Sequence, residues 1–345
     1  MTCLDLKNGK LSTEMFDSVV VCNGRYSLPK TPTASSIAGL ENFTGEIIHS
    51  HDYRSPKKFE GKNVLIVGAG PSGIDISLEI ADEKGSKVHL CHMLSDTFKD
   101  LPLNIIQHSG TIKRIDVSNV HLTNGTELKG IDAIIFATGY LYDFSFLDEN
   151  VGIKVTKEGR VENIYLHLIN MNDPTMFIFA IPQKILPFPV YHQQACLIKK
   201  VLKGETKLPS KEMMMKEVDE EWRERGRKGI PERHSHKMST SDMLWNYDDR
   251  ICSLASIDPI KPVIRNIFES LHIHRKNNSR GYKNLRFKII DDGTFEVIPP
   301  SSKSNHSSFQ TVHEFKQEEF KFRNEVVEPS YNGVKERESS KTPAC

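Results

Sequence analysis

Three glycines determine the chemistry that this sequence offers most clearly. Gly68, Gly70 and Gly73 follow the apolar run at residues 64–67 in the spacing G-x-G-x-x-G, and an apolar-periodic segment follows them. In a strand–turn–helix frame, the first glycine permits a tight turn, the second lets a pyrophosphate approach the backbone, and the third lets helix and strand pack closely. The positive end of the helix then faces the phosphates. This frame favours dinucleotide binding over a structural turn, with the predicted site made by Gly68, Ala69, Gly70, Pro71, Ser72 and Gly73.

The end of the next predicted strand, residues 87–92, bears on which dinucleotide binds. Folds that prefer NAD place an acid about 20 residues past the glycines, on the ribose 2′-hydroxyl. This chain has Cys91 and His92 there and no acid. That favours NADPH, because a 2′-phosphate repels a carboxylate and a partly cationic His92 could attract it. The alternative is that His92 is only a solvated residue at the end of a strand.

The elements around this turn can be predicted from periodicity and turn residues. A strand at residues 17–22 and a strand at 132–137 both end near a glycine followed by an aromatic residue. We interpret them as two copies of one structural motif, a strand that ends at a glycine lying against a cofactor. The other predictions for the first half are a hairpin at 1–16, a loop-rich connection at 35–60, a helix reaching about 82, and an antiparallel insert at 103–135.

The second half of the chain has a different pattern. We predict strands at 166–169 and 176–180, helices at 193–203, 211–228 and 262–275, and a hairpin at 285–298. Residues 299–345 are rich in Ser, Lys, Glu and Asn with few apolar residues, which predicts a disordered tail.

Composition excludes several classes of function. The 46 basic and 45 acidic side chains of the 345 residues nearly balance, which argues against a nucleic-acid surface. The six cysteines form no C-x-x-C, which weighs against a zinc knuckle and a disulfide reductase. There is no G-x-S-x-G elbow, no apolar run of the ~20 residues that a membrane span needs, and no visible signal peptide. Histidine pairs two residues apart lack partnering ligands, so we predict no metal site.

Two further stretches resemble a known family. Phe43, Gly45, His49 and Tyr53 have the spacing of the F-x-G-x-x-x-H-x-x-x-[FY] fingerprint of class B flavin monooxygenases, and residues 136–140 resemble their A-T-G-Y segment. The sequence is most similar to the flavin-containing monooxygenases, also called dimethylaniline monooxygenases. Several stretches resemble the insect branch, which includes senecionine N-oxygenase. The resemblance is good over residues 5–205 and loose over 206–298.

The resemblance implies a fold, cofactors and a reaction. The fold would be α/β, a two-dinucleotide-binding-domain flavoprotein with parallel Rossmann-type sheets. NADPH would reduce FAD, and a flavin C4a-hydroperoxide formed with O2 would oxygenate an amine or a sulfide, as in xenobiotic metabolism. Thr138 and Gly139 would lie near FAD, and His49 would help to connect the two domains around NADP. The alternative for His49 is a capped loop histidine, and no catalytic residue is assigned.

One departure from the family affects the expected domains. No G-x-G-x-x-G for the FAD pyrophosphate precedes residue 17. We therefore expect an N-terminally truncated member in which the first FAD-binding half-domain is missing. Residues 1–45 and 132–298 would be the remnant of the FAD-binding domain plus a C-terminal helical region, and residues 46–131 the NADPH-binding Rossmann domain.

The same departure leaves two functions open. One is the monooxygenase, and the other is a catalytically silent NADPH-binding protein. The oligomeric state and the localisation are open as well: homo-oligomer formation and microsomal association are both compatible with the sequence, and a cytoplasmic location is slightly favoured.

Overall fold

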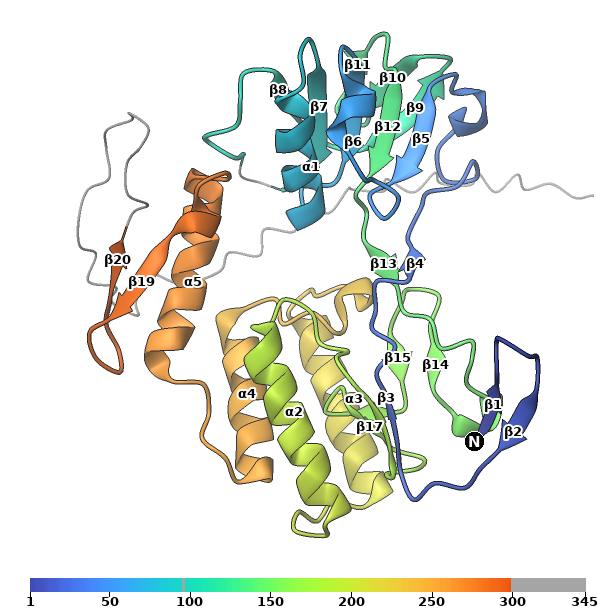
Figure 1. The fold of residues 1–345 in the computed structure, drawn as a ribbon, viewed down its shortest axis with the longest axis vertical. Coiled ribbons are helices and arrows are strands. Elements are labelled where there is room, and N and C mark those ends of the chain that lie inside the picture. Colours follow the sequence, from blue (N-terminus) through green and yellow to red (C-terminus); the bar gives the residue numbers. More distant parts are fainter. Residues whose placement is uncertain (95–96, 299–345) are drawn as a thin grey trace, which may run out of the picture.

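The computed structural model describes residues 1–94 and 97–298, which form two bodies joined by short strands (Figure 1). The predicted disordered tail at 299–345 lies outside the described residues. One body contains a five-stranded parallel sheet. Its strands, in spatial order, are β5 (Glu46–His49), β12 (Ala133–Phe136), β6 (Asn63–Val67), β7 (Lys87–His92) and β8 (Ile105–Ser109).

Apolar residues alternate between the two covered faces of this sheet. Val64 and Ile66 pack on helix α1 (Pro71–Ala81), in one cluster with Ile74 and Ile80. Leu65 belongs to the cluster on the other face, where an antiparallel sheet covers the parallel one. That sheet consists of β9 (Ile112–Asp116), β10 (Asn119–Leu122) and β11 (Glu127–Leu128). Burial on both faces explains the unbroken apolar run of β6.

The structure corrects three expectations for this body. β5 lies inside the stretch predicted to be loop-rich, and β8 lies inside the predicted antiparallel insert but pairs parallel with β7. Both are edge strands of the sheet, and both mix polar with apolar residues, so neither shows a continuous apolar run. In addition, the predicted boundary after residue 131 falls in front of β12, whereas β12 lies within this sheet between β5 and β6.

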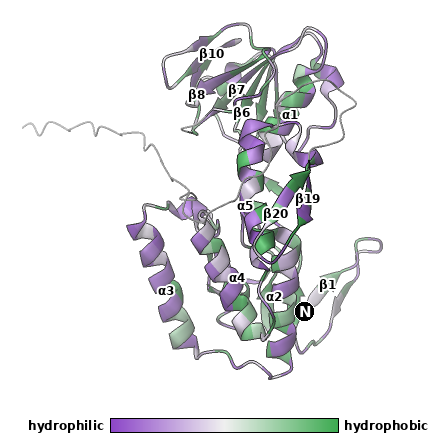
Figure 2. Cartoon of the chain, turned by 90° about the vertical axis from the view of Figure 1, so that its left-hand side faces the viewer, coloured by the Kyte–Doolittle hydropathy of each residue, from purple (hydrophilic) through white to green (hydrophobic). Residues whose placement is uncertain are grey.

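The other body contains a smaller sheet and three helices. Its strands, in order, are β16 (Ile164–Tyr165), β17 (Ile169–Asn170), β18 (Met176–Ile178) and β3 (Val19–Val21), with β3 parallel to β18. The helices are α2 (Pro187–Leu202), α3 (Lys211–Arg227) and α4 (Ser241–Ala255). Helices α2 and α3 were predicted, and α4 was not. The hydropathy colouring shows α3 as polar over most of its surface (Figure 2).

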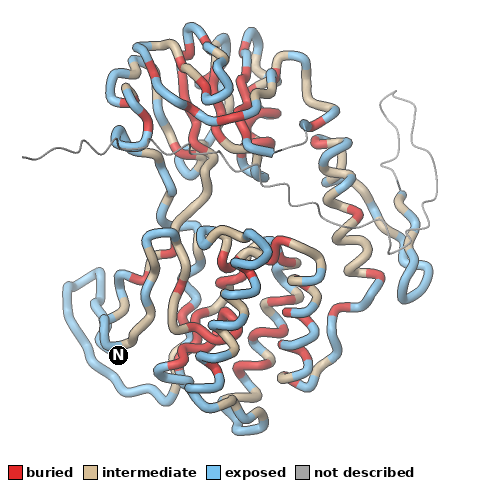
Figure 3. The backbone as a smooth tube through the Cα atoms, turned by 180° about the vertical axis from the view of Figure 1, so that it is seen from behind, coloured by how far each residue is buried: buried red, intermediate tan, exposed pale blue. Residues whose placement is uncertain are grey.

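Buried residues concentrate in the large sheet and on the inner sides of the helices (Figure 3). Three hairpins lie outside these sheets, namely β1 (Thr2–Leu4) with β2 (Leu11–Thr13), β14 (Lys154–Val155) with β15 (Val161–Glu162), and β19 (Arg286–Ile289) with β20 (Phe295–Ile298). The hairpins predicted at 1–16 and 285–298 are confirmed. Short 3-10 turns occur at η1 (Leu40–Asn42), η2 (Pro56–Phe59), η3 (Glu149–Val151), η4 (Glu232–His234) and η5 (Tyr282–Asn284).

Two connections hold the bodies together. β4 (Leu28–Pro29) pairs antiparallel with β13 (Tyr140–Leu141) in the segment between them (Figure 1). Helix α5 (Pro262–Asn277) runs beside both bodies, and the chain after it contacts α1, where Arg280 pairs with Asp82 at 2.6 Å and Lys283 with Asp75 at 2.8 Å. Among the described residues, no helix is both long and apolar enough to cross a membrane.

A pair of histidines, His89 buried and His108 half-buried, makes the large sheet sensitive to pH. His89 on β7 lies with its Nδ1 atom 2.9 Å from Nε2 of His108 on β8. Burial, followed by the charges of His108 and Lys87, lowers the pKa of His89 to about 4. The folded state therefore favours the neutral ring, whose contribution to stability is present above the unfolded pKa of about 6.5 and is lost as the pH falls toward 4.

We expect the free energy of unfolding to drop by about 2 kcal/mol from this group between pH 7 and pH 5. Substituting His89→Asn, which keeps a polar group near the Nδ1 position, should remove that part of the pH dependence. Urea unfolding of both proteins at the two pH values measures it. An identical pH dependence in the variant would contradict the assignment to His89.

Candidate functional site

The glycine turn has the geometry that its spacing predicts. Gly68 has φ 110°, and a Cβ atom there would lie 2.5 Å from the Ala137 carbonyl oxygen. A Cβ on Gly73 would lie 1.8 Å from the Gly68 carbonyl oxygen. Any side chain at Gly73 would thus push α1 away from the turn, and one at Gly68 would also strain the backbone.

Gly70 differs from the other two glycines, because its surroundings are open. No atom lies within 4 Å of the position that its Cβ would take, and Gly70 itself is exposed. It is the N-cap of α1 and provides no side-chain cap, so the first N–H groups of the helix face solvent beside exposed Pro71 and Ser72, with Ala69 half-buried. The turn can therefore accept an anion against its backbone.

The family fingerprint surrounds the start of β5. A Cβ on Gly45 would lie 2.7 Å from the ring of Phe43 and 2.3 Å from the carbonyl oxygen of Asp132. Phe43 therefore needs a glycine at this place, and β5 can then pair with β12 from Glu46 onward. At the far end, the Tyr53 hydroxyl donates to Glu79 of α1 at 2.9 Å.

His49 ends β5 and faces the connection between the bodies. It is 3% exposed, its Nδ1 accepts from the His51 N–H at 3.0 Å, and its ring lies 5.3 Å from that of Tyr140 on β13. Desolvation lowers the pKa of His49, against the opposing effect of the Gly139 backbone, so the ring is neutral near pH 7. His49 is a buried residue at a strand end rather than a capped histidine in a loop.

Thr138 and Gly139 lie in the connection itself. Thr138 Oγ1 donates to the Lys30 carbonyl, and the Lys30 N–H donates to the Gly139 carbonyl at 2.9 Å. Gly139 has φ 83°, with no atom within 4 Å of a Cβ position. Two hydrogen bonds hold the backbone at this point, and the space beside Gly139 is open.

His92 does not fit either interpretation of its sequence position. It is 5% exposed, and its ring lies edge-on to Phe98 at 6.4 Å. Burial lowers the pKa of His92, so the ring is neutral near pH 7 and carries no charge for a 2′-phosphate. It is also not a solvated strand-end residue, because the segment that includes Phe98 covers it.

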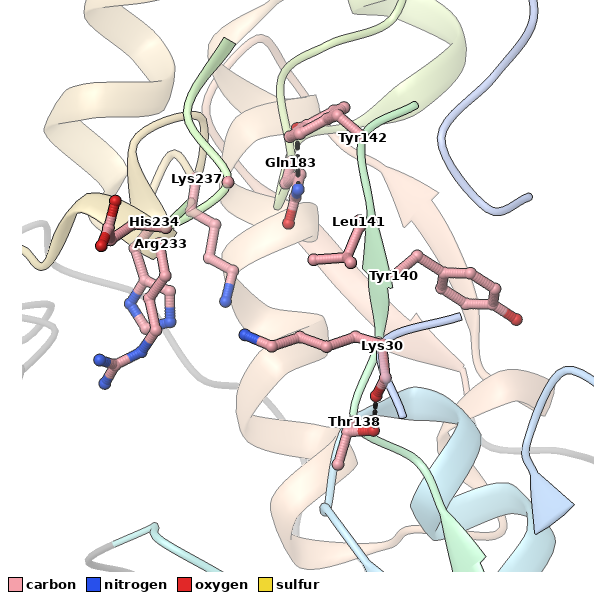
Figure 4. A pocket seen from close by; sticks show the side chains of 12 residues that line it. Lys30, Thr138, Tyr140, Leu141, Tyr142, Gln183, Arg233, His234 and Lys237 are labelled. Atoms are coloured by element: carbon pink, nitrogen blue, oxygen red, sulfur yellow. Dashed lines mark hydrogen bonds between the residues drawn. The ribbon is translucent and has the colours of Figure 1, made fainter. Parts of the chain in front are cut away.

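The sequence analysis missed a basic cavity of about 230 Å³ at the connection. It is lined by Lys30, residues 138–142, Glu158, Gly159, Gln183, Arg233, His234 and Lys237. The side chains of Lys30 and Lys237 extend toward each other there, and Tyr140 points away (Figure 4). The lining comes from distant parts of the chain, so no local motif could have indicated it. Among the described residues, no group of three or more His, Cys, Asp or Glu side chains could hold a metal ion.

Comparison with known proteins identifies the family. A profile described as flavin-binding monooxygenase-like matches residues 3–97 and 93–270. The chain belongs to the flavin-binding monooxygenase-like family. It is 33% identical over 251 residues to flavin-containing monooxygenase FMO GS-OX-like 9 of Arabidopsis thaliana, covering 71% of this chain and 53% of that protein. It is 32% identical over 273 residues to FMO GS-OX1 of the same plant, covering 73% and 58% respectively.

Solved structures of the family have the same fold. S-allyl-L-cysteine S-oxygenase from Allium sativum superposes with a TM-score of 0.73 at 29% identity, covering 82% of this chain and 64% of that one. Tmm from a Pelagibacter strain superposes with a TM-score of 0.71 at 23% identity, covering 87% and 65%. The predicted family and the predicted two-dinucleotide fold class are confirmed, and FAD and NADPH are the cofactors of this family. Assignment to the insect branch stays a prediction.

The family match extends over only part of the relatives. The chain spans about half the length of the curated relatives that it matches, 53% of one and 58% of another. The roles of the glycine turn, His49, Thr138 and Gly139 are not tested by these similarities. They remain predictions.

The glycine turn provides a matched pair of variants. Gly73→Ala should lower the free energy of unfolding by about 3 kcal/mol or more, because the new Cβ overlaps a backbone carbonyl that cannot move aside. Gly70→Ala should fold like the natural protein, because the space is open, yet bind NADPH about tenfold more weakly by obstructing the pyrophosphate. Thermal unfolding and fluorescence titration measure the two effects. Unchanged NADPH affinity in Gly70→Ala would contradict the assigned role of the turn.

Proposed function

We propose that this chain acts in an NADPH- and FAD-dependent monooxygenase that oxygenates soft nucleophiles, by N- or S-oxygenation of amines or sulfides. The observation that carries the proposal is the open Gly70 turn after β6, a central strand of the parallel sheet, in a chain of the flavin-binding monooxygenase-like family. In this proposal residues 46–136 bind NADPH. The flavin, when bound, supplies the oxygen-transfer chemistry.

The residues of this chain would bind and orient the two cofactors. The backbone of the turn at residues 68–73 would bind the pyrophosphate of NADPH at the start of α1. Thr138 and Gly139 would lie along the flavin, since they are held by Lys30 and open on one side. His49, neutral and packed on Tyr140, would fix the sheet relative to this segment and so set the distance between the two cofactors.

The preference for NADPH rests on a different argument from the one expected. His92 is buried and neutral, so its charge cannot select the 2′-phosphate. What remains is the absence of an acid at the end of β7, where the strand finishes with Cys91 and His92. A site without a carboxylate there tolerates a 2′-phosphate that an NAD-specific site repels.

The substrate class is supported by the relatives. One similar structure is described as an S-allyl-L-cysteine S-oxygenase, which acts at a thioether sulfur. We infer that a sulfide, or an amine with a comparable lone pair, is the acceptor here as well.

The test is an assay of the purified full chain with added FAD. We expect FAD to remain bound through gel filtration, NADPH to bind at least tenfold more tightly than NADH, and a thioether or tertiary amine to gain one oxygen atom from labelled O2. Absorbance, fluorescence titration and mass spectrometry measure these properties. A chain that binds NADPH but retains no flavin and yields no oxygenated product would contradict the proposal and favour the silent NADPH-binding protein.

A further inference from the structure

The cavity at the connection contains an unusual concentration of positive charge. Lys30, Arg233 and Lys237 line it together with His234, and Glu158 is the single acidic residue in the lining. In the part of the chain that the structure describes, no carboxylate lies within 4 Å of the charged groups of these cations, whereas Arg280, Lys283 and many others have such partners. The cations are therefore gathered without counterions.

Two sets of backbone hydrogen bonds hold these cations in place. Lys30 follows β4, and its backbone is bonded to Thr138 and Gly139. The segment at 233–237 is fixed to the loop after β18, because the Gln183 N–H donates to the His236 carbonyl at 2.8 Å and the Met238 N–H donates to the Gln183 carbonyl at 2.9 Å. Backbone hydrogen bonds therefore bring these cations close together.

Two buried histidines, His236 and His167, form a hydrogen-bonded relay that also holds the segment at 233–237 in place. The Val161 N–H donates to Nε2 of His236 at 2.8 Å, so the proton of this neutral ring is on Nδ1. That atom lies 2.8 Å from Nδ1 of His167, which in turn donates through Nε2 to Glu221 at 3.1 Å. Each ring nitrogen of the relay has a partner, which leaves little freedom for the backbone between His234 and Lys237.

The cations destabilise one another. The pKa of Lys237 is lowered to about 8 by burial and then by the charges of Lys184, Arg233 and Lys30. The pKa of His234 is lowered to about 4, first by burial and then by a set of neighbours that includes Lys237 and Arg233. Lys184, beside Gln183, has φ 55°, a backbone conformation that is unfavourable for lysine. Repulsion between desolvated like charges is a cost that a bound anion would remove.

A solvated basic surface is the simpler explanation, but the geometry disfavours it. Lys237 is half-buried, and the side chain of Lys30, although exposed, extends toward Lys237 across the cavity instead of away from its charge (Figure 4). The volume of about 230 Å³ is smaller than the roughly 300–1,000 Å³ of pockets for whole small molecules. It suits a compact anion or one anionic portion of a larger ligand.

We propose that the cavity formed by Lys30, Arg233 and Lys237, with Lys184 beside it, is a second anion site that binds a phosphate or pyrophosphate group, separate from the glycine turn. None of the turn residues 68–73 lines the cavity. Multiple convergent ammonium and guanidinium donors match the several oxygens and the double charge of such a group. The inference does not depend on the oxygenase activity.

The direct test is calorimetric titration of the full chain with inorganic pyrophosphate. We expect a binding site that persists in Gly70→Ala, where the glycine turn is obstructed, and that weakens with added salt. Lys237→Met and Arg233→Gln should each weaken binding about tenfold or more, and Arg233 is exposed, so its substitution should leave the fold intact. Lys129→Met, at an exposed lysine of the other body, is the matched control and should bind as the natural chain does.

Two results would overturn the site. One is no pyrophosphate binding at millimolar concentration, and the other is unchanged affinity in both Lys237→Met and Arg233→Gln. Loss of pyrophosphate binding in Gly70→Ala, with the cavity intact, would likewise place the anion at the glycine turn and refute a separate site.

A second titration distinguishes the sources of the phosphate. If Lys237→Met with Arg233→Gln weakens both pyrophosphate and NADPH, the dinucleotide supplies the group that enters the cavity. If it weakens pyrophosphate alone, a separate phosphate-bearing ligand uses the site. Both outcomes support an anion site here and differ only in its occupant, and neither depends on whether the chain oxygenates a substrate.

Discussion

The contact between α1 and the end of β6 is the constraint on which the nucleotide site depends. Gly73 lies so close to the Gly68 carbonyl, and Gly68 so close to Ala137, that only glycine fits at either position. This approach brings the start of α1 over the ends of β6 and β12, the place where parallel sheets bind nucleotides. The open Gly70 between them then exposes backbone N–H groups to a phosphate. The buried helix face of Ile74 and Ile80 holds this geometry in place.

The connection between the two bodies depends on few atoms and carries much of the proposed function. β4 and β13 pair over two residues each, and bonds from Lys30 to Thr138 and Gly139 extend that pairing toward the sheet. His49 packs on Tyr140 from the sheet side. The basic cavity opens on the other side of the same segment. A ligand that bound at both the turn and this segment would therefore fix the position of one body relative to the other.

Local patterns predicted the parts of the structure that are determined locally. The run of β6, the glycine spacing and the periodicity of α1 lie within twenty residues, and each reports one physical requirement. The sequence did not predict the edge strands β5 and β8 correctly, because a strand with one unpaired side carries polar residues that interrupt the apolar pattern. Helix α4 was not predicted, because a charged residue interrupts its apolar pattern. Asp248 lies in its middle and reads as solvent-exposed, yet it is fully buried and pairs with Arg265 at 2.6 Å.

The sequence could not show which polar side chains are buried, or which residues far apart in the chain lie close together in the fold. His92 ends its strand, where solvent is the usual expectation, but Phe98 from the following segment covers it. Among the cations of the cavity, Lys30 lies about 200 residues before Arg233 and Lys237 in the chain. Only the pairing of Gln183 with His236 and Met238, and of Lys30 with Gly139, brings them together.

Hydrogen exchange of the full chain with and without NADPH, read by mass spectrometry, tests the central claim most directly. The account predicts slower exchange for the backbone N–H groups at residues 69–76 when NADPH binds, because the turn and the first turn of α1 then donate to the phosphates. The hairpin β19–β20, which lies away from the turn, should exchange at the same rate in both states. NADPH binding that leaves exchange at residues 69–76 unchanged would contradict the assignment of this turn as the nucleotide site.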